Sequence, residues 1–528
     1  MADHIDLKIF HYHFLTGGVA TVVQQALKAF HTHLPEIRSI ELVAGRIPEG
    51  IRRAVSRHNG KCTVVPEIGY RDQVKGDKKQ TAQEAGNLAR HLLDSFGSDD
   101  SLWWVHNFHL GKNAVFTQAL LQIIYSGQSQ RIILQIHDFP ECGRFENLRY
   151  LLNTLTLDPY PLSPWVRYAV LNQRDRDILV QAGVPARAVF LLENPVFHDR
   201  VPEQRNSVRD ALEREFGKTF PNFDAQAPLL LYPIRTIRRK NALEAVLLCL
   251  LLEGPANILI TLPGVSAAEK SYSAVVEKIF ADGLCSGLWG IGTALEGVNL
   301  SFEDLVACSD LVLSTSVQEG FGYLFINSLL WSLPLVARDL DILKGLKGLF
   351  AEYPAYFYDR IVVPFTEGKS LRQAYRCKIL SLSDLLPEEE KDRLLRSVET
   401  LLQDDLVDFS YLPVAEQDVF LRELAAGEKS AICRRENGRT LSALQALLSS
   451  GADRGGGESV WSDNRRSEVR RRFGAAAYAE GFRSLIASFG TQPGSPAEAA
   501  GARVPDRSIQ EAVLKAFLKI EHLRLLYD

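Results

Sequence analysis

Residues 310–339, DLVLSTSVQEGFGYLFINSLLWSLPLVARD, are the stretch that decides the fold. The opening DLVLSTS is a short apolar run with β-branched residues, which is typical of a buried strand in a parallel sheet. Gly320 and Gly322 interrupt the run, FINSLLWSL then places apolar residues at helical spacing, and PLVARD returns to a strand pattern. The stretch therefore predicts a strand, a glycine loop and a helix. Free backbone N–H groups at such a junction favour an anionic ligand, and an ordinary βα unit whose EGFG only makes a turn is the equal alternative for this stretch alone.

Length and charge exclude several classes of protein. A chain of 528 residues is expected to form two or more domains, because single cores stop growing near roughly 250 to 300 residues. Its formal charge of −4 offers no overall basic field for nucleic acid. The N-terminus lacks a signal-peptide pattern, and the longest apolar run, near residues 245–252, is too short to span a bilayer. We expect a cytoplasmic protein with no nucleic-acid partner and no transmembrane segment.

A second strand, glycine turn and helix opens the chain. DLKIFHYHF alternates like a strand, Gly17 and Gly18 form a turn, and ATVVQQALKAFHTHL has helical spacing. Two adjacent glycines let a phosphate or sugar approach the backbone, although a tight turn is the simpler explanation. His11 and His13 share one face of this strand without a third ligand at metal spacing, which favours packing or cleft lining over a metal site.

Further strands alternate with helices in both halves of the chain. The first half continues with SIELVAGR, CTVVPEIGY, SLWWVHNFH, RIILQIHDF and VRYAVLN, and the second begins with PLLLYPIR, NILITLPG and LWGIGTAL. This alternation predicts α/β domains with mostly parallel sheets.

A cationic loop follows the first strand of the second half. Arg235 and Lys240 stand five residues apart in a loop that enters a helix. An arginine fork and a lysine point charge beside a helix N-terminus form a suitable cradle for a diphosphate. Arg238 and Arg239 are further cations, for which a solvated surface is the simpler role.

The order of these motifs resembles the donor-site signature of retaining GT-B glycosyltransferases, especially glycosyltransferase family 4. In that family a Glu before GFG contacts the donor sugar, and a second Glu eight residues later binds the nucleotide ribose. Glu319 matches the first, and Gly320, Phe321 and Gly322 complete the motif, whereas the second position is Asn327. Asparagine still hydrogen-bonds a hydroxyl, but as a neutral group.

Other segments match the same family. The GGV turn implies that Gly17 and Gly18 contact the donor, and the Arg-x4-Lys pattern is usually followed by glycine, where this chain has Asn241. His137 in HDFP corresponds to a strand-end histidine near the reacting centre. The segment WVHNFHL is similar to the WVHDYHL of trehalose-phosphate synthases, whose Asp helps to hold the acceptor; Asn107 takes its place here, beside His106 and His109.

The resemblance implies an α/β fold of the GT-B type, with two Rossmann-like doubly wound domains facing a cleft and helical additions in the C-terminal part. The expected divisions are an acceptor-side domain at 1–196, a linker at 197–227, a nucleotide-sugar-binding domain at 228–345, its helical remainder at 346–459, terminal helices at 460–490, and a loop and C-terminal helix at 491–528.

The implied function is transfer of a hexose, with retention, from UDP-, GDP- or ADP-hexose to a sugar, sugar phosphate, small polyol or acid. The expected catalytic residues are His137, Glu319, Arg235 and Lys240. Donor contacts are expected from Gly17, Gly18, Arg235, Lys240, Glu319, Gly320, Phe321, Gly322 and Asn327, and acceptor contacts from Asn107, His106 and His109. We expect no metal and no permanently bound cofactor, and a homo-oligomer is possible.

Two alternatives remain open from the sequence. Asn107 and Asn327 stand where relatives carry acids, which would suit a non-catalytic sugar-nucleotide-binding or assembly protein. A GT-B phosphorylase or epimerase is the other alternative.

Overall fold

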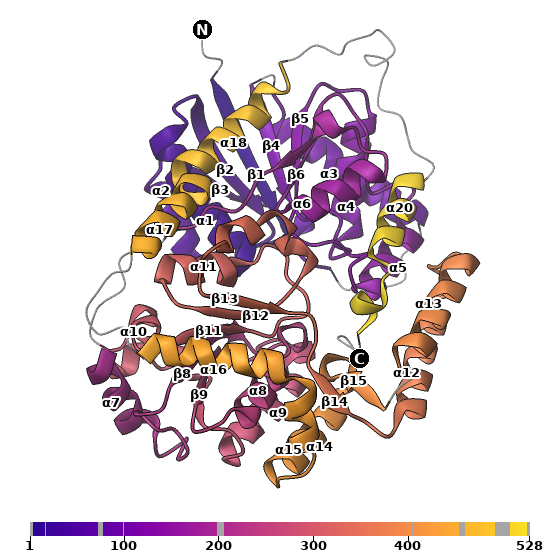
Figure 1. Ribbon diagram of the computed structural model, residues 1–528. Helices are drawn as coiled ribbons and strands as arrows, with labels where there is room; N and C mark the ends of the chain where they lie inside the picture. The colour runs from indigo at the N-terminus through magenta and orange to yellow at the C-terminus, as the bar shows by residue number, and fades with distance from the viewer. Residues whose placement is uncertain are drawn as a thin grey trace. The chain divides into compact units, whose positions relative to one another are not determined.

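The computed structural model describes residues 4–15, 17–71, 78–98, 100–197, 205–402, 405–452, 460–490 and 507–524. Its backbone contacts define two compact units (Figure 1). The first consists of Met1–Phe197 and Arg470–Leu518, and the second of His198–Val469 and Lys519–Asp528. The predicted loop at 491–506 and most of the glycine-rich connector, at 453–459, lie outside the described residues.

The first unit is built on a seven-stranded parallel sheet in the order β3-β2-β1-β4-β5-β6-β7. The strands are β1 (Ile5–His11), β2 (Ile37–Ala44), β3 (Lys61–Val64), β4 (Ser101–His106), β5 (Arg131–Ile136), β6 (Val166–Val170) and β7 (Val189–Leu191). Strand order reverses between β1 and β4, which makes the carboxyl ends of these two strands the topological switch point.

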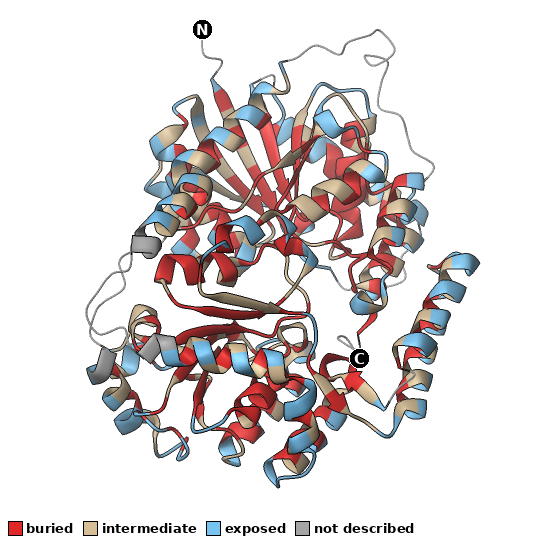
Figure 2. Ribbon diagram, in the orientation of Figure 1, coloured by how far each residue is buried: buried red, intermediate tan, exposed pale blue. Residues whose placement is uncertain are grey.

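Helices cover both faces of this sheet, as expected for parallel strands, and the central strands are buried (Figure 2). One face packs against α1 (Gly18–His33), α2 (Glu49–Ser56) and α18 (Ala475–Ala487). The other packs against α3 (Lys78–Phe96), α4 (Ala114–Tyr125), α6 (Gln173–Gln181) and α20 (Ser508–Phe517). A further helix, α5 (Phe145–Thr154), packs against α4. The chain therefore returns to the first unit through α18 and α20.

The second unit repeats the doubly wound plan with six parallel strands in the order β10-β9-β8-β11-β12-β13. The strands are β8 (Leu229–Arg235), β9 (Asn257–Leu262), β10 (Gly287–Trp289), β11 (Leu311–Ser314), β12 (Leu335–Arg338) and β13 (Ala355–Tyr358). Its switch point lies between β8 and β11. A two-stranded antiparallel sheet, β14 (Val362–Pro364) with β15 (Leu406–Asp408), is added to it.

The helices of the second unit follow its strands and then extend it. Around the sheet are α7 (Arg205–Phe216), α8 (Ala242–Leu251), α9 (Ala267–Ala281), α10 (Phe302–Ala307) and α11 (Tyr323–Trp331). The C-terminal part adds α12 (Gly368–Ser381), α13 (Glu388–Leu401), α14 (Val414–Ala425), α15 (Ser430–Glu436), α16 (Gly438–Ala452) and the start of α17 (Val460–Phe473). Within the described ranges, no helix combines the length and the apolar character needed to cross a membrane.

The predicted α/β fold with two doubly wound domains is confirmed, and the second sheet continues beyond the expected division at residue 345. The sixth strand of the second sheet, β13, begins at Ala355, ten residues later. It is an edge strand whose AYFY sequence is mostly half-buried, so it lacks the continuous apolar run that marks a central strand. The final predicted helix is also shorter, because α20 ends at Phe517 and a 3₁₀ turn follows at Ile520–Leu523.

Candidate active site

The switch point of the second unit brings together a lysine and a glutamate from two loops. One loop connects β8 to α8 and carries Lys240, and the other connects β11 to α11 and carries Glu319. Because β8 and β11 are parallel neighbours, both loops leave the same edge of the sheet. Lys240 Nζ forms an ion pair with Glu319 Oε1, and an Arg239 guanidinium nitrogen lies 3.8 Å from Glu319 Oε2.

Hydrogen bonds between the two loops fix this geometry. Tyr232 Oη donates to the carbonyl oxygen of Lys240 at 2.5 Å, and Thr315 Oγ1 donates to that of Asn241 at 2.9 Å. In return, the backbone N–H of Val317 donates to the carbonyl oxygen of Arg239 at 3.0 Å. The ion pair is therefore held by backbone on both sides, which limits the rearrangement needed to bind a ligand.

The pair is nearly enclosed by protein. The side chain of Glu319 is 12% exposed and that of Lys240 is 15% exposed. Burial acts to raise the pKa of Glu319, but the charges of Lys240 and Arg239 outweigh it and the pKa is lowered. Glu319 is therefore a carboxylate at neutral pH. Arg235 is less confined: its side chain is 41% exposed and lies 3.7 Å from Glu269.

Asn241 occupies the position where the family pattern that this loop resembles usually has glycine. Its backbone lies in the left-handed region, at φ 51° and ψ 43°. Asparagine tolerates this region better than other residues with a side chain, so the departure from the family pattern preserves the loop. The side chain also donates from Nδ2 to Glu244 Oε2 at 2.9 Å.

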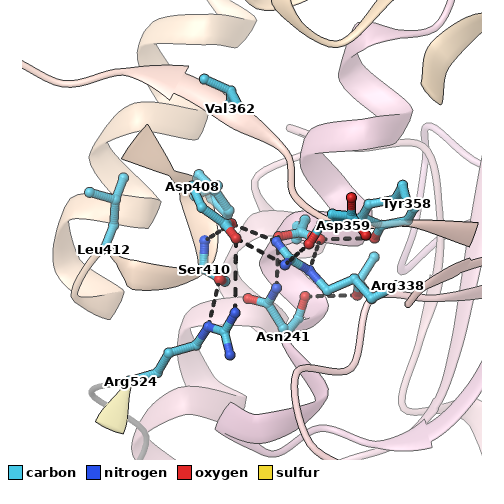
Figure 3. A network of polar contacts seen from close by, with 12 residues as sticks. Asn241, Arg338, Tyr358, Asp359, Val362, Asp408, Ser410, Leu412 and Arg524 are labelled. Carbon is cyan, nitrogen blue, oxygen red and sulfur yellow. Dashed lines mark hydrogen bonds and ion pairs between the residues drawn. The ribbon is translucent and has the colours of Figure 1, made fainter. Parts of the chain in front are cut away.

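Behind Asn241 lies a buried network of charges, drawn in Figure 3. Arg338, at the end of β12, forms ion pairs with Glu244 on α8 and Asp408 on β15, each at 2.6 Å. Tyr358 Oη donates to Glu244 Oε1 at 2.9 Å. The Arg338 side chain is 2% exposed. This network supports the loop that carries Lys240, and the sequence did not predict it.

Arg524 and Arg238 extend the network. Arg524 Nε donates to Ser410 Oγ at 2.9 Å, and Arg238 donates to the carbonyl oxygens of Ser410 and Leu412 at 3.2 and 3.0 Å. The expectation that Arg238 and Arg239 belong to a solvated surface is therefore wrong. Arg238 is 7% exposed and its guanidinium group bonds to backbone carbonyl oxygens of the fold. The guanidinium group of Arg239 lies near the carboxylate of Glu319.

The loop before α11 needs glycine at one position. Gly322 has φ 87°, and a Cβ there would lie 2.6 Å from the Phe325 ring. Phe321 is 5% exposed and packs at 4.9 Å from the Tyr323 ring. Just over one turn into α11, Asn327 Oδ1 is buried and has no hydrogen-bond partner among the described residues. An unpartnered buried acceptor is unfavourable, so this oxygen is suited to accept from a ligand hydroxyl.

In the first unit, three histidines gather at the carboxyl ends of β1, β4 and β5. His106 Nδ1 and His137 Nε2 share a hydrogen bond of 2.8 Å, and His11 Nδ1 donates to the carbonyl oxygen of His106 at 3.2 Å. Burial lowers the pKa of His137 to about 4 and that of His11 to about 3. These rings are therefore neutral near pH 7, and His137 acts there as a hydrogen-bonding group without charge.

Asn107 has a structural task in this cluster. Its backbone is left-handed, at φ 52°, and its side-chain Oδ1 accepts a hydrogen bond of 2.8 Å from the backbone N–H of His137. Tyr12 Oη donates to the carbonyl oxygen of Asn107 at 3.0 Å. Asn107 thus positions His137, while contact between Asn107 and an acceptor stays a prediction.

His109 lies in the core, which speaks against its predicted acceptor contact. Its side chain is among the most buried polar groups, at 1% exposure, between the rings of Phe108, Phe139 and Tyr160. Neither ring nitrogen has a hydrogen-bond partner among the described residues. Burial lowers the pKa of His109 to about 3. The sequence pattern placed His109 beside functional residues without showing which way it faces.

Burial of His109 should lower the stability of the fold as pH falls, and the variant His109→Met should not show this loss. The unfolded chain takes up a proton near pH 6.5 and the folded chain only near pH 3, so stability is lost as pH falls below 6.5. From pH 7 to 5 we expect the free energy of unfolding of the parent to fall by about 2 kcal/mol relative to the variant. Urea unfolding at both pH values measures this difference. His91→Met, at an exposed position of α3, is the control, and an equal pH response of parent and His109→Met would contradict the prediction.

Gly17 and Gly18 leave open space at the start of α1. Gly17 is extended, at φ 167°, a conformation that any residue adopts. A Cβ at Gly17 would come no closer than 3.8 Å to the carbonyl oxygen of Leu15, and one at Gly18 would meet nothing within 4 Å. Neither the backbone conformation nor the packing therefore requires glycine here.

Comparison with known proteins gives one relative of similar length, and no family model matches the chain. The relative is mannosylglucosyl-3-phosphoglycerate synthase of Petrotoga mobilis (strain DSM 10674 / SJ95), 31% identical over 531 residues that cover 99% of each chain. Among solved structures, the apo form of the lipopolysaccharide outer core galactosyltransferase WaaB is 11% identical, covering 91% of this chain and 99% of that one with a TM-score of 0.48. Anabaena Alr3699/HepE in complex with UDP and glucose is 15% identical, covering 85% and 100%, with a TM-score of 0.45.

The match to the Petrotoga protein spans both doubly wound units and both groups of loop residues described above. An identity of 31% over nearly the whole of both chains is sufficient to assign the family. The chain is a glycosyltransferase of GT-B fold and belongs to the family of mannosylglucosyl-3-phosphoglycerate synthase.

Proposed function

We propose that the chain is a retaining glycosyltransferase that moves a hexosyl group from a nucleotide sugar to a glucosyl-3-phosphoglycerate or a close analogue. The observation that carries the donor site is the Lys240 and Glu319 pair at the switch point of the second unit. The name of the Petrotoga relative, which describes a mannosylglucosyl-3-phosphoglycerate as its product, supports the acceptor class.

The residues of the second unit divide between the two ends of the donor. Lys240 and the more exposed Arg235 stabilise the diphosphate as the bond between it and the anomeric carbon breaks. Glu319 accepts hydrogen bonds from hydroxyls of the hexose, and Asn327 Oδ1 accepts from a ribose hydroxyl. The acceptor oxygen then bonds to the anomeric carbon with retained configuration, and its proton passes to the departing phosphate.

His137 in the first unit supplies a neutral hydrogen bond. Its ring is held through Nε2 by His106 and its backbone by Asn107, so its position is defined on both sides. A burial-lowered pKa of about 4 keeps the ring uncharged at the pH where the diphosphate is anionic. We assign His137 to a hexose hydroxyl, as a contact that orients the donor.

Turnover with defined substrates tests this proposal. The full chain is incubated with UDP-, GDP- or ADP-hexoses and glucosyl-3-phosphoglycerate, and nucleotide release is followed together with the anomeric configuration of the product by NMR. Acceptor-dependent release with retention supports the proposal. Tight nucleotide-sugar binding without turnover would favour a non-catalytic binding protein, and an inverted product would overturn the retaining mechanism.

The open space at Gly18 gives a separate prediction about donor binding. Gly18→Ala adds a methyl group with no described atom beyond its chain neighbours within 4 Å, so the unfolding temperature should match that of the parent. If the donor approaches the backbone here, nucleotide-sugar affinity should fall at least tenfold, or about 1.4 kcal/mol. Calorimetric titration measures the affinity. Gly50→Ala is the matched control, because a Cβ at Gly50 also meets nothing within 4 Å. Equal affinity in all three proteins would remove Gly18 from the donor site.

A further inference from the structure

A half-buried lysine of the first unit, Lys112, has no anionic partner among the residues that the structure describes. Lys112 lies in the loop between β4 and α4, and its ammonium group is 5.8 Å from the centre of the Tyr70 ring. In the described parts of the chain, no carboxylate lies within ion-pair distance of it. Burial, and then the nearby charge of Arg144, lower the pKa of Lys112. A cation in this setting is unfavourable until an anion joins it.

The backbone holds Lys112 in place. Gly111 has φ 68°, and a Cβ there would lie 2.5 Å from the carbonyl oxygen of Asn147. The carbonyl oxygen of Lys112 accepts a hydrogen bond of 3.0 Å from the backbone N–H of Arg71. Asn113 Nδ2 donates to two carbonyl oxygens, those of Glu67 and Gly69, at 2.7 Å each. The loop is therefore rigid on both sides of the lysine, as a preformed binding site requires.

The groups around Lys112 favour an anion. Arg144 is 28% exposed and forms an ion pair of 3.0 Å with Asp138. Tyr70 is 55% exposed, and its ring lies 4.6 Å from that of His13. Of the described groups named here, two are cations (Lys112 and Arg144) and one is a carboxylate (Asp138), and the Tyr70 hydroxyl is an additional donor. The site follows the same strand end, β4, as the hydrogen-bonded pair of His106 and His137.

We propose that Lys112, Arg144 and Tyr70 bind the anionic end of the acceptor, the phosphate or carboxylate of a phosphoglycerate group. The proposal rests on the proposed function, which assigns the diphosphate of the donor to different cations, Arg235 and Lys240 in the second unit. Lys112 acts as a point charge, Arg144 as a fork that still holds Asp138, and Tyr70 as a directed hydroxyl donor.

Titration of the full chain with three probes tests the site. The probes are 3-phosphoglycerate, glycerate and inorganic phosphate, which separate the two anionic groups, with glycerol as the uncharged counterpart. We expect 3-phosphoglycerate to bind and glycerol not to bind. Lys112→Gln should weaken 3-phosphoglycerate binding by roughly 10- to 100-fold, since it removes one charge-assisted contact. Lys28→Gln, on the exposed side of α1, is the matched control.

A second variant and a second readout keep the test decisive. Tyr70→Phe removes only a hydroxyl from an exposed ring and should weaken the same probe by a smaller factor with an unchanged unfolding temperature. Affinity of the parent should also fall as salt rises. Equal affinity for 3-phosphoglycerate in the parent and Lys112→Gln would overturn the proposal, as would binding of glycerol as tight as that of the acid.

The two proposals fail in different ways. If hexosyl transfer occurs and Lys112→Gln leaves the KM of the acceptor unchanged, the anion site is wrong and the proposed function stands. If 3-phosphoglycerate binding depends on Lys112 but no donor gives turnover, the site stands and the proposed function is wrong. If transfer occurs, Lys112→Gln should raise the KM of the acceptor by the same factor as the loss of affinity, with kcat and nucleotide affinity close to those of the parent.

Discussion

Replacing Glu319 with glutamine is expected to lower turnover by roughly 10- to 100-fold while changing nucleotide affinity little. The loss corresponds to one charge-assisted contact to the hexose, worth roughly 1.5 to 3 kcal/mol. It should appear in turnover because the reacting carbon belongs to the hexose, and only contacts that strengthen in the transition state raise the rate. Glutamine has a similar shape, so the loops held by Tyr232 and Thr315 should keep their positions.

Lys240→Met should lower both nucleotide affinity and turnover, because Lys240 is assigned to the diphosphate in the bound donor and as it departs. It removes a charge assigned to the diphosphate, so nucleotide affinity should fall by roughly 10- to 100-fold. Steady-state kinetics and calorimetric titration with the nucleoside diphosphate measure both quantities for the two variants. Glu416→Gln, at an exposed position of α14, is the control for the chemical change in Glu319→Gln. Turnover of Glu319→Gln equal to that of the parent would defeat the role assigned to Glu319.

The sequence predicts the fold because its signals are local. The central strands are continuous apolar runs that end in glycine or polar residues, and the structure places both β8 and β11 in the centre of a buried sheet. The Arg-x4-Lys and EGFG motifs follow these two strands, so parallel pairing alone places Lys240 close to Glu319. Near the donor site, the sequence did not predict the direction in which side chains point. Arg238 and Arg239 are adjacent, yet one is buried in the fold and the other faces Glu319.

The buried network could not be predicted in the same way, because its members are distant in sequence. Glu244 and Arg338 are 94 residues apart, and Arg338 and Asp408 are 70 apart. The available signal was indirect: Glu244 interrupts the apolar helix ALEAVLLCLL, and Arg338 ends a buried strand. Buried charges of this kind are rare unless they are paired, so each predicted a partner without saying which residue it was.

Arg338→Met is expected to lower the free energy of unfolding of the second unit by about 3 to 5 kcal/mol, the usual effect of removing one partner from a buried ion pair. Methionine fills much of the space, but Glu244 and Asp408 would then face each other without the guanidinium that pairs with both. Arg524 lies 3.9 Å from Asp408 and compensates that carboxylate only in part. Urea unfolding, with Arg360→Met at an exposed position as the control, measures the change.

The pH dependence of the stability lost in Arg338→Met shows whether the cause is the missing charge or a missing packing contact. Burial raises the pKa of Glu244 even with Arg338 present, and Arg338 opposes that rise while it holds the pKa of Asp408 low. Without Arg338 both folded-state pKa values should lie above those of the unfolded chain, so the folded state binds more protons and the variant gains stability as pH falls toward 5. The difference between parent and Arg338→Met should therefore shrink from pH 8 to pH 5. A lost packing contact would give the same difference at both pH values, and Glu244→Gln combined with Arg338→Met should recover part of the stability only if charge is the cause.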